Sequence, residues 1–324
     1  MRYRRLFETA QDGILILDAG SGTIRDVNPF LMEMLGCVRE DVVGRKLWEM
    51  GFFKDVQRSR EAFLRLQKDG YVRYEDLPLE RKDGTVFEVE FISNVYTVGD
   101  ERVIQCNIRD ITERKRIEHT LRFLAQSGGT ASSGDFFQAL ARYLAQSLSM
   151  DYVCIDRLET DLLSAQTVAV YYEGKFEDNI SYTLKDTPCG DVVAKKTCCF
   201  PRDARRLFPK DEVLQRMSAE SYAGTILWSS RGKPIGLIAV IGRRPLAYPG
   251  LVESVLQLVA VRAAGELDRW QMEEVLRAGN AELTHFNSAM VDRELRMIEL
   301  KKRINELCVK AGLPPEYKLE FGEK

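Results

Sequence analysis

The run CNIRDITERKR, residues 106–116, joins two different hydrophobic patterns. Up to Ile108, apolar Ile104, Cys106 and Ile108 alternate with Gln105 and Asn107, which is the period of a half-buried strand. From Glu113 onward, charged residues dominate a pattern of helical period. The run therefore predicts a strand that passes directly into a solvated helix.

Strand and turn signals fill the residues before this junction. Residues 13–18 and 23–27 have the pattern of two strands, and Asn28 is expected to cap a short helix that begins at Pro29. Residues 71–80 and 85–92 predict a hairpin, in which Gly84 can adopt the positive φ that the turn needs. Residues 1–116 are therefore expected to form one α+β domain.

The order of these motifs resembles that of a PAS sensor domain. The resemblance rests, in chain order, on Val27-Asn28-Pro29, Leu35-Gly36, Glu40-Asp41 with Gly44, Arg81-Lys82-Asp83-Gly84-Thr85 and Asp110-Ile111-Thr112. It implies that Asp110 and Thr112 bond across the sheet-to-helix junction and relay a signal there. The alternative is that Thr112 only caps the helix. From the apolar pattern we expect a ligand pocket lined by Leu35, Trp48, Phe53, Ile104, Cys106 and Ile108.

A second domain is expected at residues 135–270, after a linker helix and a Gly/Ser-rich flexible break at 117–134. Helical patterns at 135–148 and 251–270 enclose strands at 152–158 and 167–172 and an apolar run at 235–241 typical of a central strand. The domain resembles a GAF domain in Thr187-Pro188-Cys189, Phe208-Pro209, Ser221-Tyr222-Ala223-Gly224 and Gly232-Lys233-Pro234-Ile235-Gly236-Leu237. Its pocket is expected to be bounded by Cys154, Cys189, Tyr222 and Trp228.

Residues 271–310 carry a heptad repeat and precede a tail at 311–324 that is expected to be loose. One seam position holds Leu276, Leu283, Met290, Met297 and Ile304, and the other holds Met272, Phe286, Leu300 and Leu307, with Gly279 and Arg293 as exceptions. The pattern predicts a coiled-coil output helix and a homodimer. In a parallel pair Arg296 would face Lys301 of the partner, so the flanking charges do not specify a parallel homodimer, and antiparallel pairing or packing on another protein stays open.

A histidine kinase is the main enzymatic alternative, because such kinases often carry PAS and GAF domains. His119 and His285 lack the proline and acidic neighbour of a phosphoacceptor box, and about 54 residues follow residue 270, too few for a kinase domain. Both histidines are therefore interpreted as solvated surface residues. The protein is expected not to be an enzyme, although the sensory part of a longer kinase stays open.

The sequence supports no particular cofactor. Residues 56–69 contain no histidine to hold a haem, and the cysteine motif of photoreactive flavin domains is missing. Cys189 is a weak candidate for tetrapyrrole attachment through the GAF resemblance. Cys189, Cys198 and Cys199 lack the spacing of a metal site and are interpreted as small buried residues.

Bulk properties exclude several partner classes. The net charge of −2 provides no cationic field for nucleic acid or anionic lipid, and no apolar run reaches the ~20 residues that span a bilayer. Without an export signal, the seven cysteines are expected to be reduced thiols in a cytoplasm.

The sequence therefore predicts a cytoplasmic α+β signal-transduction protein. The PAS domain, the GAF domain or both would bind a small ligand or cofactor and relay their state through helical linkers to a partner, such as a histidine kinase or response regulator. A dimerisation scaffold without a ligand is the remaining alternative.

Overall fold

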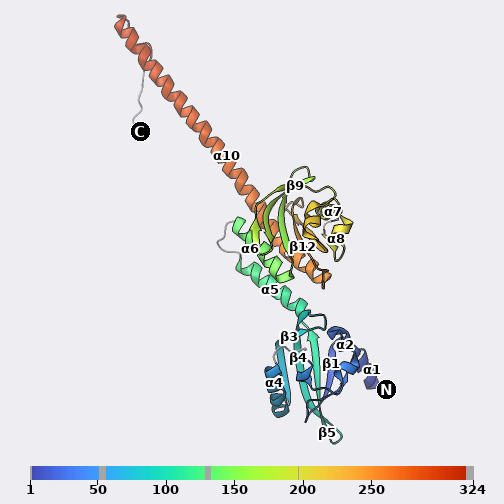
Figure 1. Cartoon of the computed structure of the whole chain (residues 1–324). Helices are drawn as coiled ribbons and strands as arrows, with labels where there is room; N and C mark the ends of the chain where they lie inside the picture. The colour runs from blue at the N-terminus through green and yellow to red at the C-terminus, as the bar shows by residue number, and fades with distance from the viewer. Residues whose placement is uncertain (1, 51–55, 128–132, 196, 319–324) are drawn as a thin grey trace. The chain divides into compact units, whose positions relative to one another are not determined.

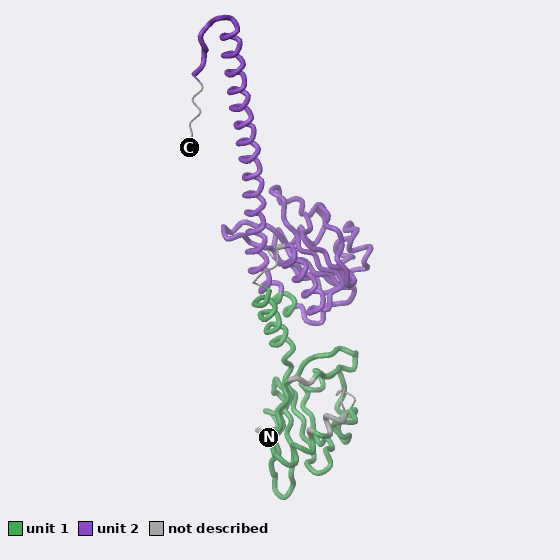
Figure 2. Tube along the Cα trace, turned by 90° about the vertical axis from the view of Figure 1, so that its left-hand side faces the viewer, with its two compact units in different colours: residues 1–129, 250–255 green, residues 130–249, 256–324 purple. Residues whose placement is uncertain are grey.

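The computed structural model describes residues 2–50, 56–127, 133–195 and 197–318. The chain divides into two compact units, residues 1–129 with 250–255 and residues 130–249 with 256–324 (Figures 1 and 2). Each unit is built around its own antiparallel sheet. The α+β class and the two-sheet organisation expected from the sequence are confirmed.

The first unit holds a five-stranded sheet in the order β2-β1-β5-β4-β3. Its strands alternate inward and outward side chains, and the inward set forms one core with the short helices. The elements are α1 (Arg2–Glu8), β1 (Gly13–Asp18), β2 (Ile24–Val27), α2 (Pro29–Leu35), α3 (Arg39–Val42), the 3₁₀ helix η1 (Leu47–Glu49), α4 (Val56–Asp69), β3 (Tyr71–Glu80), β4 (Val86–Val98), β5 (Glu101–Asp110) and α5 (Thr112–Gln126).

Asn28 fastens the start of α2 to the sheet. Its side-chain oxygen accepts hydrogen bonds from the N–H groups of Leu31, at 3.1 Å, and Ile14, at 2.8 Å. Its amide nitrogen donates to the carbonyl oxygen of Asp12 at 2.9 Å. The predicted N-cap is therefore confirmed, and the same buried side chain also ties the helix to β1.

The second unit holds a seven-stranded sheet, with the order β10-β11-β12-β6-β7-β8 and with β9 also paired to β7. Helices α6 and α10 lie against one face, and α7–α9 lie on the other (Figure 1). The elements are α6 (Ser133–Leu148), β6 (Tyr152–Leu158), β7 (Ser164–Tyr172), β8 (Lys175–Glu177), β9 (Ser181–Thr183), α7 (Pro188–Lys195), β10 (Thr197–Phe200), α8 (Ala204–Leu207), α9 (Glu212–Met217), β11 (Ser221–Trp228), β12 (Pro234–Gly242) and α10 (Pro249–Lys310).

Two sequence expectations change in detail. The helix expected at 251–270 and the coiled-coil helix expected at 271–310 are one continuous helix, α10. No proline or turn motif interrupts the intervening residues, so the backbone has no reason to break there. The flexible break expected at 127–134 falls mostly on 128–132, which lie outside the described residues.

Gly236 sets how closely α10 approaches the sheet. A Cβ built on this β12 residue would lie 2.6 Å from Cδ2 of Leu267 on α10 and 2.4 Å from the carbonyl oxygen of Asp156 on β6. Both separations are too short for real atoms, so only glycine fits between the helix and the neighbouring strand. Leu267 is fully buried in this contact.

We predict that Gly236→Ala destabilises the second unit by about 1–3 kcal/mol, because the added methyl group forces α10 or β6 to move. Gly265→Ala is the matched control, since a Cβ at Gly265 meets no atom within 4 Å and the helix gains up to about 1 kcal/mol from the better helix former. Denaturant unfolding monitors both variants. Equal stabilities for the two would contradict this role of Gly236.

Candidate functional site

A cavity of about 330 Å³ lies in the second unit, between the sheet and helices α7 and α9. Most of its wall is apolar or aromatic, which is the usual character of a small-molecule site. The residues that line it are Tyr152, Cys154, Thr167, Ile180, Tyr182, Thr183, Lys185, Thr187, Pro188, Cys189, Lys210, Asp211, Glu212, Val213, Leu214, Tyr222 and Ile241.

A buried polar cluster adjoins this cavity. Asp156 is completely buried, and its Oδ2 accepts hydrogen bonds from the hydroxyl of Tyr182, at 2.8 Å, and the thiol of Cys154, at 3.3 Å. Its Oδ1 has no hydrogen-bond partner among the described residues. The Tyr222 hydroxyl donates to Sγ of Cys189 at 3.3 Å. Tyr182, Cys154, Cys189 and Tyr222 all line the cavity, so the cluster presents several polar groups to it.

Burial controls the protonation of this cluster. It raises the pKa of Asp156 to about 6, although the hydrogen bonds from Tyr182 and Cys154 partly oppose the shift. The pKa of Cys154 lies well above the usual value, first because of its hydrogen bond with Cys189 and then because of burial. Burial also raises the pKa of Tyr222, so the Cys154 thiol and the Tyr222 phenol stay protonated near neutral pH.

A second hollow of about 440 Å³ is lined in part by charged side chains, among them Asp186 and Asp191. It shares Lys185, Thr187 and Lys210 with the cavity wall. Nζ of Lys210, after α8, lies 3.0 Å from Oδ2 of Asp186, in the loop before α7. This exposed ion pair joins the two loops beside the cavity. Because both side chains are exposed, the attraction between them is weak, and water and salt can separate the two loops.

The structure brings three of the four predicted residues of this pocket together. Cys154, Cys189 and Tyr222 line the cavity, whereas Trp228 is 40% exposed and lies outside its lining. Trp228 is six residues beyond Tyr222 on β11, about 20 Å away along an extended strand.

Sequence reasoning missed Asp156 and Tyr182. Asp156 shares the period-2 face of β6 with Tyr152 and Cys154, so an acidic residue at an inward position of a buried strand was the available signal. Tyr182 lies on the three-residue strand β9, which carries too little pattern to be recognised.

The pocket residues predicted for the first unit lie in its core. Leu35, Ile104, Cys106 and Ile108 are buried there, and the half-buried Trp48 packs on Phe63 with ring centroids 5.2 Å apart. Phe53 lies outside the described residues. The Ser93 hydroxyl lies 3.0 Å from Sγ of Cys106, and burial raises the pKa of this thiol to about 12.

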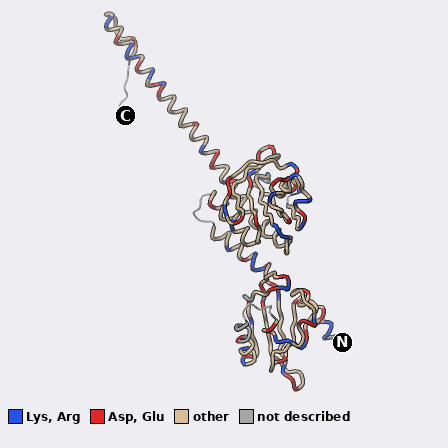
Figure 3. The backbone as a smooth tube through the Cα atoms, in the orientation of Figure 1, with Lys and Arg blue, Asp and Glu red and all other residues tan. Residues whose placement is uncertain are grey.

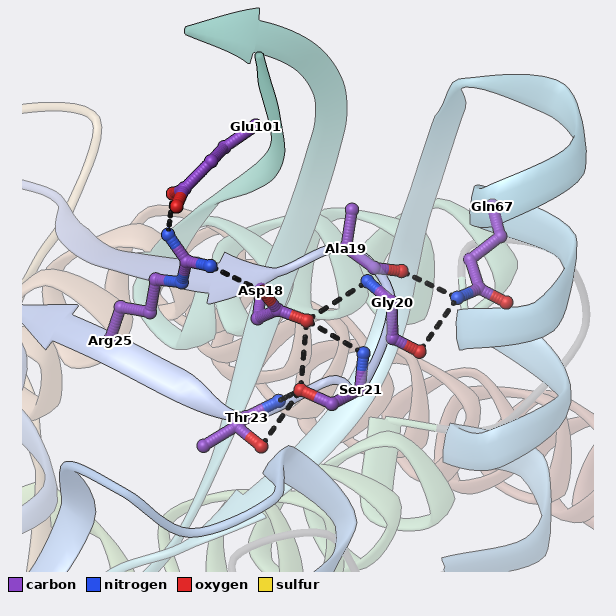
Figure 4. A network of polar contacts seen from close by, with 8 residues as sticks. All are labelled: Asp18, Ala19, Gly20, Ser21, Thr23, Arg25, Gln67 and Glu101. Carbon is purple, nitrogen blue, oxygen red and sulfur yellow. Dashed lines mark hydrogen bonds and ion pairs between the residues drawn. The ribbon is translucent and has the colours of Figure 1, made fainter. Parts of the chain in front are cut away.

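An open pocket of about 520 Å³ on the first unit is formed by charged residues that already bind one another. Asp18 Oδ1 accepts from the N–H groups of Gly20, at 3.1 Å, and Ser21, at 2.8 Å, and Arg25 bridges Asp18 and Glu101 (Figure 4). The hydrogen bonds with Ser21 and then Arg25 lower the pKa of Asp18 to about 2. The network closes the β1–β2 turn, which is a structural role.

Asp110 and Thr112 bond across the sheet-to-helix junction, but not as a simple helix cap. The Thr112 hydroxyl accepts from the N–H of Glu88 on β4 at 2.9 Å, and Oδ1 of Asp110 accepts from the Thr112 N–H at 2.9 Å. The N-cap position is Ile111, which has no side-chain cap bond. The alternative in which Thr112 only caps α5 is therefore wrong, because its hydroxyl binds the sheet.

Other candidate chemistry has little support in the described parts of the chain. His119 on α5 and His285 on α10 are both exposed. All seven cysteines are free thiols. The described residues contain no cluster of three or more His, Cys, Asp or Glu side chains placed to hold a metal ion, and none of their helices is long and apolar enough to cross a membrane.

Comparison with known families assigns both units. Residues 11–113 match the model of the PAS domain, and residues 134–267 match that of the GAF domain. The chain contains a PAS domain followed by a GAF domain. The PAS domain thus contains the Asp110-Ile111-Thr112 junction, and the GAF domain contains the cavity.

Two curated relatives are named as sensors. The methyl sulfide methyltransferase-associated sensor of Methanosarcina acetivorans is 25% identical over 341 residues, covering 99% of this chain and 33% of that protein. Sensor protein kinase WalK of Staphylococcus aureus is 24% identical over 164 residues, covering 46% of this chain and 36% of that protein. The PAS–GAF chain thus spans about a third of the length of either relative.

Solved structures that match the chain include a PAS domain and a phytochrome chromophore-binding domain. The PAS domain of an HTR-like protein from Haloarcula marismortui is 31% identical, with 34% of this chain and 89% of that chain covered and a TM-score of 0.29. The chromophore-binding domain of Stigmatella aurantiaca phytochrome P1 is 12% identical, with 78% and 93% covered and a TM-score of 0.40.

Asp156 should make the stability of the GAF domain depend on pH. Its folded pKa of about 6 exceeds its ordinary value of 3.8, so its contribution to stability is present at low pH and is lost as pH rises from about 4 to 6. Asp156→Asn removes this loss. We expect the variant to gain about 2 kcal/mol relative to the wild type between pH 4 and pH 7.

Urea unfolding of both proteins at several pH values measures this gain, and the shared pH dependence of all other groups cancels in the difference. A stability difference that stays constant from pH 4 to pH 7 would contradict burial of an ionisable Asp156.

Thr112→Val should loosen the start of α5 in the PAS domain, because it leaves the Glu88 N–H without its side-chain partner. Hydrogen exchange at residues 112–117 is expected to accelerate by about 5–100-fold, which corresponds to about 1–3 kcal/mol. The control is Thr284→Val, whose hydroxyl bonds only within α10. Unchanged exchange in Thr112→Val would show that this bond does not hold the helix to the sheet.

Proposed function

We propose that this PAS–GAF protein binds a small ligand in the GAF cavity and relays its occupancy through α10 to a partner. The observation that carries the proposal is the position of Gly236. The backbone of Asp156, on strand β6 beside the cavity, contacts Gly236 within the sheet. Leu267 of α10 contacts Gly236 from the face of the sheet opposite the cavity. The cavity cluster and the output helix are therefore separated by one glycine.

The chemistry of the cavity suggests what the ligand must supply. Asp156 Oδ1 is buried without a partner in the described residues, and a ligand that brings a hydrogen-bond donor to the Asp156–Tyr182 side would satisfy it. The wall also contains Lys185 and Lys210 together with Asp211 and Glu212, so the charges of its outer side chains balance. A small polar molecule that donates hydrogen bonds fits this cavity better than an apolar one.

The relay is a shift between two arrangements of α10. A ligand that forms a hydrogen bond with Tyr182 or Asp156 stabilises the position of β6 in which that hydrogen bond has good geometry. Because β6, β12 and Leu267 are closely packed around Gly236, a small displacement of β6 changes the packing of α10. In the PAS domain, Asp110 and Thr112 are proposed to couple the sheet to α5 in the same way.

The proposed output is a homodimer formed through α10 that acts on a histidine kinase or response regulator in the cytoplasm. The apolar heptad positions of α10 are exposed in the single chain, which supports pairing with another helix. The free state of all seven thiols fits a reducing compartment. The relative named as a sensor kinase supports the second candidate, in which a longer kinase contains this sensory region.

Native mass spectrometry of the full chain, purified from its source organism, tests ligand binding. We expect one bound small molecule per chain, and loss of most of it in Val213→Trp, because the larger ring fills the cavity. Leu163→Trp is the control, since Leu163 is 70% exposed and is not part of the cavity wall.

A wild-type protein that carries no small molecule, and that shows no thermal stabilisation by a metabolite extract, would favour the scaffold alternative. An absorption spectrum of the same sample identifies haem, flavin or a bilin. Transfer of labelled phosphate to His119 or His285 would instead support the kinase candidate.

A further inference from the structure

The exposed seam of α10 also contains information on the orientation of its partner. Leu276, Leu283, Phe286 and Leu300 are 54–66% exposed, although each is a large apolar side chain at a heptad position. Leu276 comes nine residues after the buried Leu267, which places it about half a turn around the helix. The seam therefore points away from the GAF sheet and is open to a second helix.

We propose that the partner is a second copy of this chain and that the two α10 helices pair antiparallel, with the two-fold axis beside Ser288. This inference rests on the dimer in the proposed function and adds its orientation and register. Residues equally distant from Ser288 then face each other across the seam. The central layers pair Phe286 with Met290 of the partner subunit, and the outer layers pair Leu276 with Leu300 of the partner subunit.

The exceptional seam residues favour this arrangement over a parallel one. In a parallel pair with matched residues, Arg293 would face the same cation of the second copy, and the two Gly279 positions would leave a gap. In the antiparallel register each Gly279 faces a Met297 and each Arg293 faces a Leu283. Arg293 then also lies beside Glu282 of the other copy, which can neutralise its charge.

The flanking charges give the same result. In an antiparallel coiled coil, the residues that flank the seam on one side of a helix face the residues on the same side of the partner helix. Glu273 therefore meets Lys301, and Glu282 meets Arg296. Each of these pairs occurs twice in the dimer. In a parallel pair Arg296 meets Lys301 and Asp268 meets Glu273, which are like charges. Figure 3 shows both signs of charge spread along α10.

Other antiparallel registers are less complementary. A shift of one heptad in one direction places Glu273 opposite Glu294. A shift of one heptad in the other direction leaves Glu273 opposite Cys308 and Lys301 opposite Asn280, so both lose their ionic partners. The register centred on Ser288 therefore combines opposite charges on both flanks with apolar layers over residues 272–304, about 50 Å of helix.

Charge reversal distinguishes the two orientations. In the antiparallel dimer Glu273→Lys and Lys301→Glu should each raise the dimer dissociation constant about tenfold at low salt, and the double variant should restore it. In a parallel dimer each single variant removes a like-charge pair and should tighten the dimer, and the double variant should tighten it further. Glu299→Lys, at an exposed position off the seam, is the matched control.

Sedimentation equilibrium of the full chain measures these constants. Weakening by both single variants with recovery in the double variant supports the proposal. Tightening by either single variant, effects no larger than that of Glu299→Lys, or a monomer at every concentration would overturn it. None of these results bears on ligand binding, which native mass spectrometry reports separately.

Disulfide trapping provides an independent readout in a Cys308→Ser background. Leu276→Cys and Leu300→Cys proteins, mixed under mild oxidation, should form a crosslinked heterodimer. Two Leu276→Cys chains should not crosslink, because about 36 Å of helix separates the cysteines. A crosslinked Leu276→Cys homodimer, or the absence of the heterodimer, would contradict the antiparallel register.

Discussion

The close approach of α10 to the GAF sheet at Gly236 is the constraint on which the rest of the account depends. Leu267 occupies the space that a side chain at position 236 would need, and the Asp156 carbonyl oxygen closes the other side. A tightly packed contact of this kind transmits displacement because neither neighbour can absorb it. The GAF cavity and α10 are thus joined by packing and not by a flexible linker.

The two domains use polar groups in their interiors differently. In the PAS domain, the side chains of Asn28 and Thr112 form hydrogen bonds that hold helices to the sheet. In the GAF domain, Asp156 keeps one carboxylate oxygen without a protein partner among the described residues. Burial of an unsatisfied carboxylate is unfavourable, so its retention next to a cavity is the feature expected of a site that binds something. This contrast is why we propose ligand binding for the GAF domain.

Local patterns predicted most of the fold and part of the site. Alternation identified β5, capping chemistry identified the start of α2, and the apolar run at 235–241 identified β12. Cys154, Cys189 and Tyr222 were found because they lie on strong strands or in recognisable motifs. The short elements β8, β9 and α7–α9 were missed because three to eight residues hold too little periodicity. Trp228 lies outside the cavity lining because it ends β11, six residues and about 20 Å beyond Tyr222.

The central claim is that the GAF cavity and α10 are coupled through the sheet. Hydrogen exchange measured by mass spectrometry on wild-type protein and on Val213→Trp, which fills the cavity from α9, tests it most directly. The account predicts altered protection at residues 256–270 of α10, on the opposite face of the sheet from the substitution, as well as around the cavity. Changes confined to the cavity side, at residues 184–217, would contradict the coupling.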